Sequence, residues 1–499
     1  MCRMTLKILY CLLLIIFLST NVYSRNKHFI SPVDFGINKT KTGIETYKLL
    51  FEIHTIAKSL GLPVIYKGIK NIDIEIPPNA ESIPLSTYTD FSDVNISVLN
   101  NSKHFFLFSL CDTMKQIVVS AHSIDEGRFY QQDLNNGTYL LSIKDRKAWV
   151  PERNGYGSPF TRRDILFIEN GHSKNKVISP YNNKQSDPCC KFVPVSSTKK
   201  TIKNLHFYRD SSSQNITFLF NITSQYNVAI ENISINTPVN SSLYGDACIK
   251  IYDSYKVKLK NVNISGTYSL PQKYGYGINM NNISDFEVDN LNATAKWGIF
   301  GNNNISNVIV KNSTLNRFDI HCYGKDIKCT NCNFKDLYNQ YSSIYGFIKY
   351  LNCTFDHCVP VLLEPSYNAY TSFNLIIKNC SFIISKDKNY VVYAKKAVKG
   401  NNERKELESI NWPNISINSL RIINNENAED FFLFYNDRSY VDKPLRGFLN
   451  IFLNDIYYSS TSTEGKLLFK LYSQPITVDN KVNFNCGKVS NHIDVISDN

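Results

Sequence analysis

The chain is 499 residues long and carries a formal net charge of +12 at pH 7, without a dense run of basic residues. This balance favours an anionic partner and argues against nucleic acid as a ligand. With 31 Tyr and 30 Phe against 4 Met, and no Pro/Gly/Ser-rich linker, the composition indicates one elongated, strand-rich unit.

Residues 1–24 have the pattern of an export signal. Arg3 and Lys7 provide a positive start, Ile8–Leu18 an apolar stretch, and Ser24 the end of a small-residue cleavage site. The apolar stretch is too short to span a bilayer comfortably. We therefore predict cleavage after Ser24 and export to the periplasm, the cell surface or the medium. We expect no integral membrane segment afterwards.

Residues 25–75 are expected to form an entry segment with a capping helix. Thr42 and Glu45 fit a T-x-x-E capping box, and Gly61 followed by Pro63 marks the end of the helix. Apolar residues recur between them at helical spacing: Ile44, Tyr47, Leu50, Phe51, His54, Ala57 and Leu60. Such a helix covers an open sheet edge, and His54 is then a packed core residue.

Eight later segments share one asparagine at a fixed place in an apolar pattern. The asparagines are Asn204, Asn232, Asn261, Asn290, Asn312, Asn331, Asn352 and Asn379. Their spacings are 28, 29, 29, 22, 19, 21 and 27 residues, with strand-like segments and no helical pattern between them. Recurrence at this period is typical of a solenoid whose turns stack on one another.

The chemistry of asparagine explains why this residue recurs. Two strands of one turn meet at a tight corner, where a residue must often adopt the left-handed backbone conformation that Asn tolerates well. The amide carries a donor and an acceptor, so stacked side chains can bond along the axis. We therefore predict that Asn261 and Asn290 stack on adjacent turns, with Val262 and Leu291 inside.

The repeats Val257–Ile264 (VKLKNVNI) and Ile327–Phe334 (IKCTNCNF) resemble those of right-handed parallel β-helix proteins of the pectate-lyase-like superfamily. The entry segment, with Asp34-Phe35-Gly36 before the helix, is similar to that of exported polysaccharide-acting members. The resemblance implies an all-β fold, a right-handed parallel β-helix solenoid over residues 76–390 with an N-terminal capping helix. Residues 391–412 then read as an exposed charged excursion. Residues 413–499 read as irregular last rungs or a β cap.

The cysteines of the mature chain fall partly on the repeat. Cys332, Cys353 and Cys380 directly follow a ladder asparagine, so we expect them to point inward as small apolar residues in a stacked row. Adjacent rungs are about 4.8 Å apart, which leaves disulfides between some of them open. His321, Cys322, Cys329 and Cys332 offer an alternative zinc site. We expect no metal and no cofactor, because the register sends Cys329 and Cys332 into a closed core.

A second alignment, of the strands before each ladder segment, places polar residues on the outside. If Ile249, Ile278 and Ile320 point inward, Lys250, Asn279 and His321 point outward on neighbouring rungs. The same alternation turns Asp319 outward, and Glu364 extends the row. Aromatic residues flank it, including Tyr276, Trp297 and Tyr367. Polar and charged groups edged by flat rings suit an oligosaccharide groove.

The sequence leaves the reaction type open. A lyase acting on an acidic sugar needs a cation and a base, which Lys250, Arg317 and His321 can supply. A hydrolase needs two carboxylates about 5–9 Å apart, such as Asp319 with Glu364 or with Asp246. The polygalacturonase signatures N-T-D, D-D, G-H-G and R-I-K are missing, as is the D-P-H-D of mannuronan epimerases. Those particular activities are therefore in doubt.

Trp149–Asp164 is a second candidate region, because Arg153 and Arg163 can clamp an anionic sugar there. We expect an exported carbohydrate-active protein that cleaves an acidic polysaccharide by lyase or hydrolase chemistry. A non-catalytic polysaccharide-binding or adhesin-like role is the alternative. Assembly beyond one chain is left open.

Overall fold

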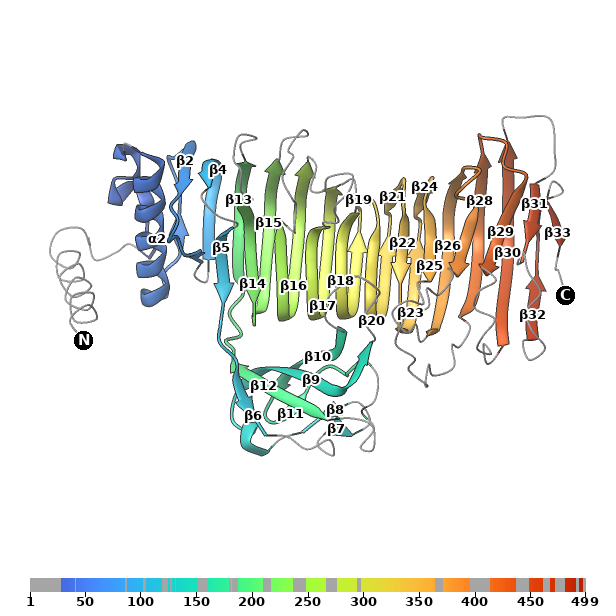
Figure 1. Ribbon diagram of the computed structural model, residues 1–499, viewed down its shortest axis with the longest axis horizontal. Helices are drawn as coiled ribbons and strands as arrows, with labels where there is room; N and C mark the ends of the chain where they lie inside the picture. The colour runs from blue at the N-terminus through green and yellow to red at the C-terminus, as the bar shows by residue number, and fades with distance from the viewer. Residues whose placement is uncertain are drawn as a thin grey trace.

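The computed structural model shows an elongated solenoid of stacked parallel strands, with one helix at its N-terminal end (Figure 1). It describes residues 28–40, 42–85, 88–101, 105–118, 124–125, 128–130, 132–150, 160–178, 181, 187–209, 217–236, 248–265, 276–293, 298–363, 371–394, 413–436, 448–460, 467–471, 481–490 and 493–496. The fold is a right-handed parallel β-helix, as the repeats predict. No helix in these ranges is long and apolar enough to cross a bilayer.

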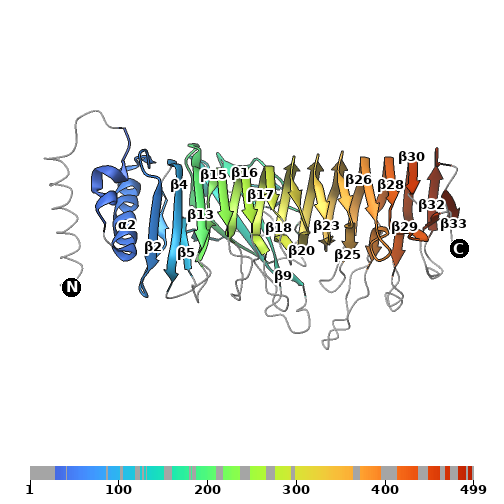
Figure 2. The same ribbon diagram turned by 90° about the horizontal axis from the view of Figure 1, so that it is seen from above.

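Helix α2 (Gly43–Leu60) closes the first rung, as Figure 2 shows from above. The Thr42 side chain accepts a hydrogen bond from the Glu45 amide at 3.2 Å, and Gly61 ends the helix in the left-handed conformation. His54 is fully buried, and its Nε2 lies 2.6 Å from the Tyr66 hydroxyl. Burial lowers its pKa to about 3. The prediction of a core histidine is confirmed.

The central rungs run through the long strands β16 (Ile249–Ser265), β17 (Tyr276–Ala293), β18 (Gly298–Lys311) and β20 (Phe318–Thr330). Apolar residues stack in register from one rung to the next, as in the row Val257, Phe286, Val308 and Ile327. These side chains are all buried. We call the outward surface of residues 249–252, 276–281, 298–303, 318–322 and 338–341 the third face, since it carries the predicted site.

The predicted asparagine ladder is confirmed. All eight residues have a positive φ, between 52° and 62°. Asn261 donates to Asn232 at 2.8 Å and Asn290 donates to Asn261 at 3.0 Å, while Val262 and Leu291 are buried. The row begins at Asp90, which accepts from Asn204. It breaks once, where Asn312 donates to Asp289 instead of Asn290.

A second row of left-handed residues lies where the third face turns into the next rung. It contains Asp253, Asn282, Asn304 and Tyr323. Because these residues differ in type, their alignment is not visible as a sequence repeat. Asn282 donates to Asp253 at 2.6 Å, so this corner is also joined along the axis.

Five described strands between residues 115 and 194 leave the solenoid and form a separate antiparallel sheet, ordered β11-β10-β9-β12-β6. Its strands are β6 (Lys115–Ile117), β9 (Thr138–Val150), β10 (Phe160–Glu169), β11 (His172–Ser173) and β12 (Pro188–Pro194). The sheet projects from one edge of the solenoid (Figure 1). It has its own small core, which includes Leu141, Ile143 and Leu166. This sheet corrects the expectation of a β-helix throughout residues 76–390. Alternating apolar residues predict parallel and antiparallel strands alike, so the pattern does not distinguish the two.

The solenoid continues after residue 413. Strands β28 (Asn414–Asn424), β30 (Phe448–Ser460) and β32 (Lys481–Cys486) pair in parallel with one another, as do β29 (Asp430–Asn436), β31 (Leu467–Lys470) and β33 (Ile493–Ile496). The described C-terminal strands are thus further rungs. The charged excursion predicted over 391–412 lies mostly outside the described residues, and Tyr390–Ala394 at its start is strand β27.

The predicted thiol row is present in the core. Cys332, Cys353 and Cys380 are each at most 2% exposed and follow one another on adjacent rungs. The Cys353 amide donates to Sγ of Cys380 at 3.4 Å. All three thiols are free, so the bridging that the sequence left open is not formed here.

Candidate functional site

The third face brings three of the predicted site residues into one row. Lys250 pairs with Asn279, Asn279 with Gly301, and Gly301 with Asp319. Two details differ from the sequence-based alignment. First, the rung of Gly301 lies between those of Asn279 and Asp319. Second, Asn302 pairs with Ile320 and Asn303 with Cys322, so His321 is an inserted residue next to the row. The irregularity re-aims a side chain, as bulges commonly do.

Tyr276 and His321 meet over this row. The Tyr276 hydroxyl lies 2.6 Å from Oδ2 of Asp319 and 2.9 Å from Nε2 of His321. Tyr276 belongs to β17 and the other two residues to β20, so the contact crosses two rungs. The two rings are edge to face, with centroids 5.6 Å apart. The phenol therefore links a carboxylate to an imidazole.

Two glycines on the intervening rung make this crossing possible. A Cβ on Gly301 would overlap the Tyr276 ring, and a Cβ on Gly298 would press on the Arg317 side chain. Any other residue at position 301 would thus displace Tyr276 from its contact with Asp319. These glycines clear the space through which Tyr276 and Arg317 reach the site.

Asp319 is completely buried and receives hydrogen bonds from several sides. Arg317 Nε donates at 2.5 Å and the Gln340 amide at 3.3 Å, in addition to Tyr276. Burial raises the pKa of Asp319 to about 6, and the charge of Arg317 and the hydrogen bonds oppose that rise. With its oxygens engaged internally, Asp319 is suited to orient Tyr276 and not to contact a ligand.

Arg317 is also held inside the site. Its side chain is 4% exposed, and its guanidinium lies 4.7 Å from the centroid of the Tyr338 ring and donates to Gln340 Oε1 at 3.3 Å. His321 is the more accessible member, with 14% of its side chain exposed. The group open to a ligand is thus His321, backed by Tyr276.

Lys250 lies three rungs before Asp319, which corresponds to about 14 Å along the axis. Its Nζ sits 4.5 Å from the centroid of the Tyr252 ring and 5.9 Å from that of Phe106. The Tyr252 hydroxyl donates to Asn279 Oδ1 at 3.3 Å. Lys250 therefore belongs to a cation and aromatic cluster of its own and does not stand beside His321.

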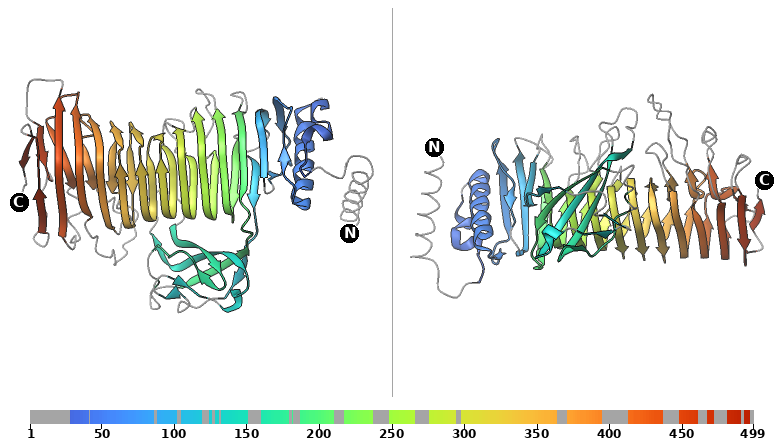
Figure 3. Two further views of the ribbon diagram at one scale, coloured as in Figure 1. Left: turned by 180° about the vertical axis from the view of Figure 1, so that it is seen from behind. Right: turned by 90° about the horizontal axis from the view of Figure 1, so that it is seen from below.

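The inserted sheet docks along the corner that borders the third face (Figure 3). The Arg163 amide donates to Asn304 Oδ1 at 2.8 Å, and Asn282 donates to Ser142 Oγ at 2.9 Å. Phe167 stacks on Tyr226 at 4.4 Å between centroids, with planes 5° apart. Arg163 is thus placed at the domain contact. The sheet lies at one edge of the third face.

Four of the predicted site residues, Arg153, Trp297, Glu364 and Tyr367, lie outside the described residues. The carboxylate pairs of a hydrolase, which need Glu364 or Asp246, fall there as well. In the part of the chain that the structure describes, no group of three His, Cys, Asp or Glu could hold a metal ion.

Sequence reasoning missed three residues of the site. Gln340 closes the rear of Asp319, Gly301 admits the Tyr276 ring, and Tyr252 holds Asn279 and Lys250. All three carry a usable signal. Gly301 and Gln340 stand in the strand segments one rung before and one rung after Asp319. Tyr252 comes two residues after Lys250 in the same strand, and alternate strand residues point to the same side.

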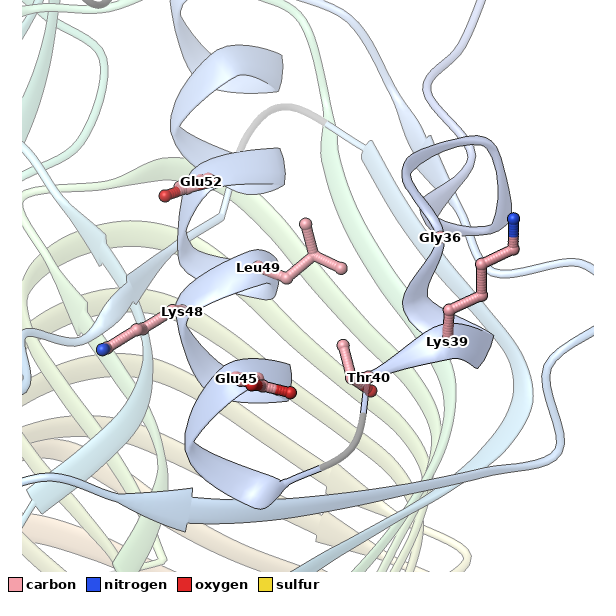
Figure 4. A pocket seen from close by; sticks show the side chains of 7 residues that line it. All are labelled: Gly36, Lys39, Thr40, Glu45, Lys48, Leu49 and Glu52. Carbon is pink, nitrogen blue, oxygen red and sulfur yellow. The ribbon is translucent and has the colours of Figure 1, made fainter.

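A separate hollow lies at the cap, far from these residues in sequence. It is lined by Gly36, Lys39, Thr40, Glu45, Lys48, Leu49 and Glu52. Figure 4 shows Thr40, Glu45 and Leu49 between α2 and the preceding turns, with Lys48 and Glu52 pointing away. It contains none of the predicted site residues.

Fold and third face together define a parallel β-helix protein with a polar and aromatic outer strip. No family model matches the sequence, and no curated protein matches it. Among solved structures, the chain is similar to the tailspike gp61 of Pseudomonas phage phi297, with a TM-score of 0.53, 12% identity and coverage of 90% of this chain and 80% of that one. It is also similar to the tailspike gp49 of Pseudomonas phage LKA1, with a TM-score of 0.51, 13% identity and coverage of 89% and 80%. These likenesses establish the fold.

Proposed function

We propose that this chain is an exported protein that binds a polysaccharide along the third face and cleaves it at the Tyr276–His321 pair. The observation that carries the proposal is the Tyr276 hydroxyl, held 2.6 Å from Asp319 and 2.9 Å from His321. An acid–base pair at an accessible, aromatic-edged strip is what cleavage of a glycosidic bond needs. The leader sequence supports export, and the similar β-helix structures are phage tailspikes.

The hydrogen bonds give each group a role. When Tyr276 donates its proton to Asp319, its oxygen accepts from Nε2–H of His321. In that tautomer Nδ1 of His321 carries no proton and is the basic nitrogen of the ring. Asp319 fixes Tyr276, and Arg317 fixes Asp319. His321 then acts as the base, and the Tyr276 phenol can return a proton to the departing oxygen.

Elimination on an acidic sugar fits this arrangement. His321 removes the C5 proton of a uronate, the electron pair forms the new C4–C5 double bond, and the C4–oxygen bond breaks. The leaving oxygen takes a proton from Tyr276, which the imidazolium of His321 replenishes. Lys250 stands about 14 Å away and would pair with the carboxylate of another sugar unit along the chain.

A screen of the mature protein against acidic and neutral polysaccharides tests this function. Elimination creates an unsaturated uronate that absorbs in the ultraviolet together with a new reducing end, whereas hydrolysis creates reducing ends alone. We expect both signals on an acidic polymer, and both should be lost in His321→Ala. Reducing ends without ultraviolet absorbance would assign hydrolysis. The absence of both ultraviolet absorbance and new reducing ends on every polymer would refute cleavage.

Binding without cleavage is the second candidate, and one observation favours it. Asp319 and Arg317 are buried and satisfy each other, which is also how a purely structural ion pair would look. In that case the third face is a binding surface, and the protein has an adhesin-like role. Retention on a polysaccharide column without products in solution would identify it.

A further inference from the structure

A cluster of four aromatic rings lies on the solenoid beyond the candidate site. Tyr390 and Tyr393 come from β27, and Phe432 and Tyr435 from β29. The Tyr390 ring stacks on Tyr393 and on Phe432, with centroids 5.2 Å apart and planes 22° and 24° apart. Tyr435 lies 5.1 Å from Tyr390 and 5.4 Å from Tyr393. The rings form one continuous group, which we call the ring platform.

The ring platform lies at the edge of the hydrophobic core. Phe432 is buried, with 8% of its surface exposed, and its neighbours Phe431 and Phe434 belong to the core. The three tyrosines are partly exposed and form the accessible part of the platform. An aromatic side chain on the outside of a strand costs free energy, because its apolar surface stays in contact with water. A ligand that covers the rings would recover that cost.

The platform is separate from the Tyr276–His321 pair. Tyr393 pairs with Leu362 on the preceding rung, and Leu362 pairs with Gln340 on the rung before that. The Gln340 amide in turn donates a hydrogen bond to Asp319. Gln340 is 2% and Leu362 3% exposed, so the two rungs between are closed to a ligand. Three rungs correspond to about 14 Å. A ligand on the rings therefore does not touch His321.

The chemistry of the platform selects the kind of ligand. Tyr390 stacks on Phe432 and Tyr393, and the three tyrosines add hydroxyl groups, so the accessible part combines ring carbon with polar edges. Lys470 Nζ lies 5.6 Å from the Phe432 centroid and is paired with Asp430 Oδ2 at 2.8 Å. The carboxylates of Asp387 and Asp430 act electrostatically on Tyr390 and disfavour an anionic ligand. Ring carbon with polar edges beside carboxylates suits the C–H face of a neutral sugar ring.

We propose that the ring platform of Tyr390, Tyr393, Phe432 and Tyr435 is a second carbohydrate-binding site, which holds neutral sugar units and performs no chemistry. The inference rests on the proposed function, because it takes a polysaccharide as the partner. It adds an anchoring site that keeps a polymer on the protein while its acidic units meet the third face. Two linked sites on one polymer increase the overall affinity.

Native electrophoresis of the full chain tests this site. Gels are cast with neutral polysaccharides (galactomannan, glucomannan, xylan and dextran) or with acidic polygalacturonate. We expect at least one neutral polymer to retard the wild-type protein. Tyr393→Ala and Tyr435→Ala should raise the dissociation constant about tenfold each, the size of losing one stacked ring.

Matched controls come from exposed tyrosines on another face. Tyr457 is 56% and Tyr208 43% exposed, and Tyr457→Ala and Tyr208→Ala should not change retardation. Equal losses in these controls would overturn the proposal, as would retardation by polygalacturonate alone or by no polymer. Size-exclusion chromatography adds one more arm. If Tyr393→Ala instead splits a larger assembly into single chains, a second copy of the chain covers the rings and the proposal is wrong.

The two proposals fail in different ways. If Tyr393→Ala still binds the neutral polymer and His321→Ala loses product formation, the platform proposal is refuted and the proposed function stands. If binding depends on the tyrosines but no polymer gives a product, the cleavage proposal is refuted and the platform proposal stands.

Discussion

The hydroxyl of Tyr276 lies 2.6 Å from Oδ2 of Asp319, two rungs further along the solenoid. This contact joins strands β17 and β20 across a rung that contributes no side chain at Gly301. It converts three separate strand residues, Tyr276, Asp319 and His321, into one hydrogen-bonded unit.

The unit predicts the effects of two substitutions on catalysis. Tyr276→Phe and His321→Ala should each lower turnover at least about 100-fold, the lower range for loss of an acid–base group. Rates are measured on a polymer that the parent cleaves. Thermal stability should change little, because Asp319 keeps its bonds to Arg317 and Gln340. Tyr457→Phe is the control. Full activity in His321→Ala would place the reaction elsewhere, with the region of Arg163 as the next candidate.

Gly301→Ala should reproduce the loss of activity without changing any polar group. The added methyl group overlaps the Tyr276 ring and must push the phenol away from Asp319. Gly277→Ala is the matched control, because its methyl group meets only the flexible end of Ile299, with Cδ1 at 3.2 Å on the following rung. Equal activity of the two variants, measured as initial rate, would show that the position of Tyr276 does not matter.

The rate should fall as the pH is lowered through about 6, where Asp319 takes up a proton. Protonated Asp319 no longer accepts from Tyr276 and Arg317 together, so the acid–base unit loses its orientation. This limb of the pH–rate profile should be missing from the residual activity of Asp319→Asn. An acid limb at the same pH in that variant would assign it to another group.

The same titration affects stability with a defined sign. The ordinary pKa is 3.8, so between about pH 4 and 6 folded Asp319 holds a proton that the unfolded chain has lost. Its contribution to the free energy of unfolding therefore falls as pH rises through this window. Urea unfolding at several pH values should show that fall relative to Asp319→Asn. A contribution that rises with pH would contradict the raised pKa.

Asn290→Ala should destabilise the fold by about 1–2 kcal/mol, because its backbone is left-handed at φ 62°. The side-chain bonds of Asn290 contribute little to this cost, because Asn290 and its ladder neighbours are exposed to water. Asn290→Gly should therefore recover most of the loss in denaturant unfolding. If Gly and Ala cost the same, the amide bonds and not the backbone carry the effect.

The thiols of Cys332, Cys353 and Cys380 should resist alkylation until the protein unfolds, because they are buried. Exposed Cys111 and Cys486 should react in the folded state and serve as internal controls. Mass spectrometry after native and denaturing alkylation distinguishes the two groups. One equivalent of zinc in protein purified without chelators would contradict the thiol row.

The solenoid, its cap and its inner rows could be predicted from the amino-acid pattern alone. Left-handed corners require asparagine-like residues and a closed core requires apolar ones, so both leave periodic marks such as Asn261 with Val262. Thr42 and Gly61 mark a helix in the same local way. Each of these signals depends on a residue and its near neighbours, and stacking then repeats it from rung to rung.

Only the tertiary structure decided the inserted sheet, the register shift at His321 and the reach of Tyr276. A strand pattern does not state which strand it pairs with, so residues 115–194 read like further rungs. His321 entered the site through an irregularity of one residue, and one residue reverses the direction of a side chain. The Tyr276–Asp319 contact depends on the missing side chain at Gly301, whose place the Tyr276 ring occupies. Such a fit depends on how neighbouring rungs pack, which no single segment of sequence contains.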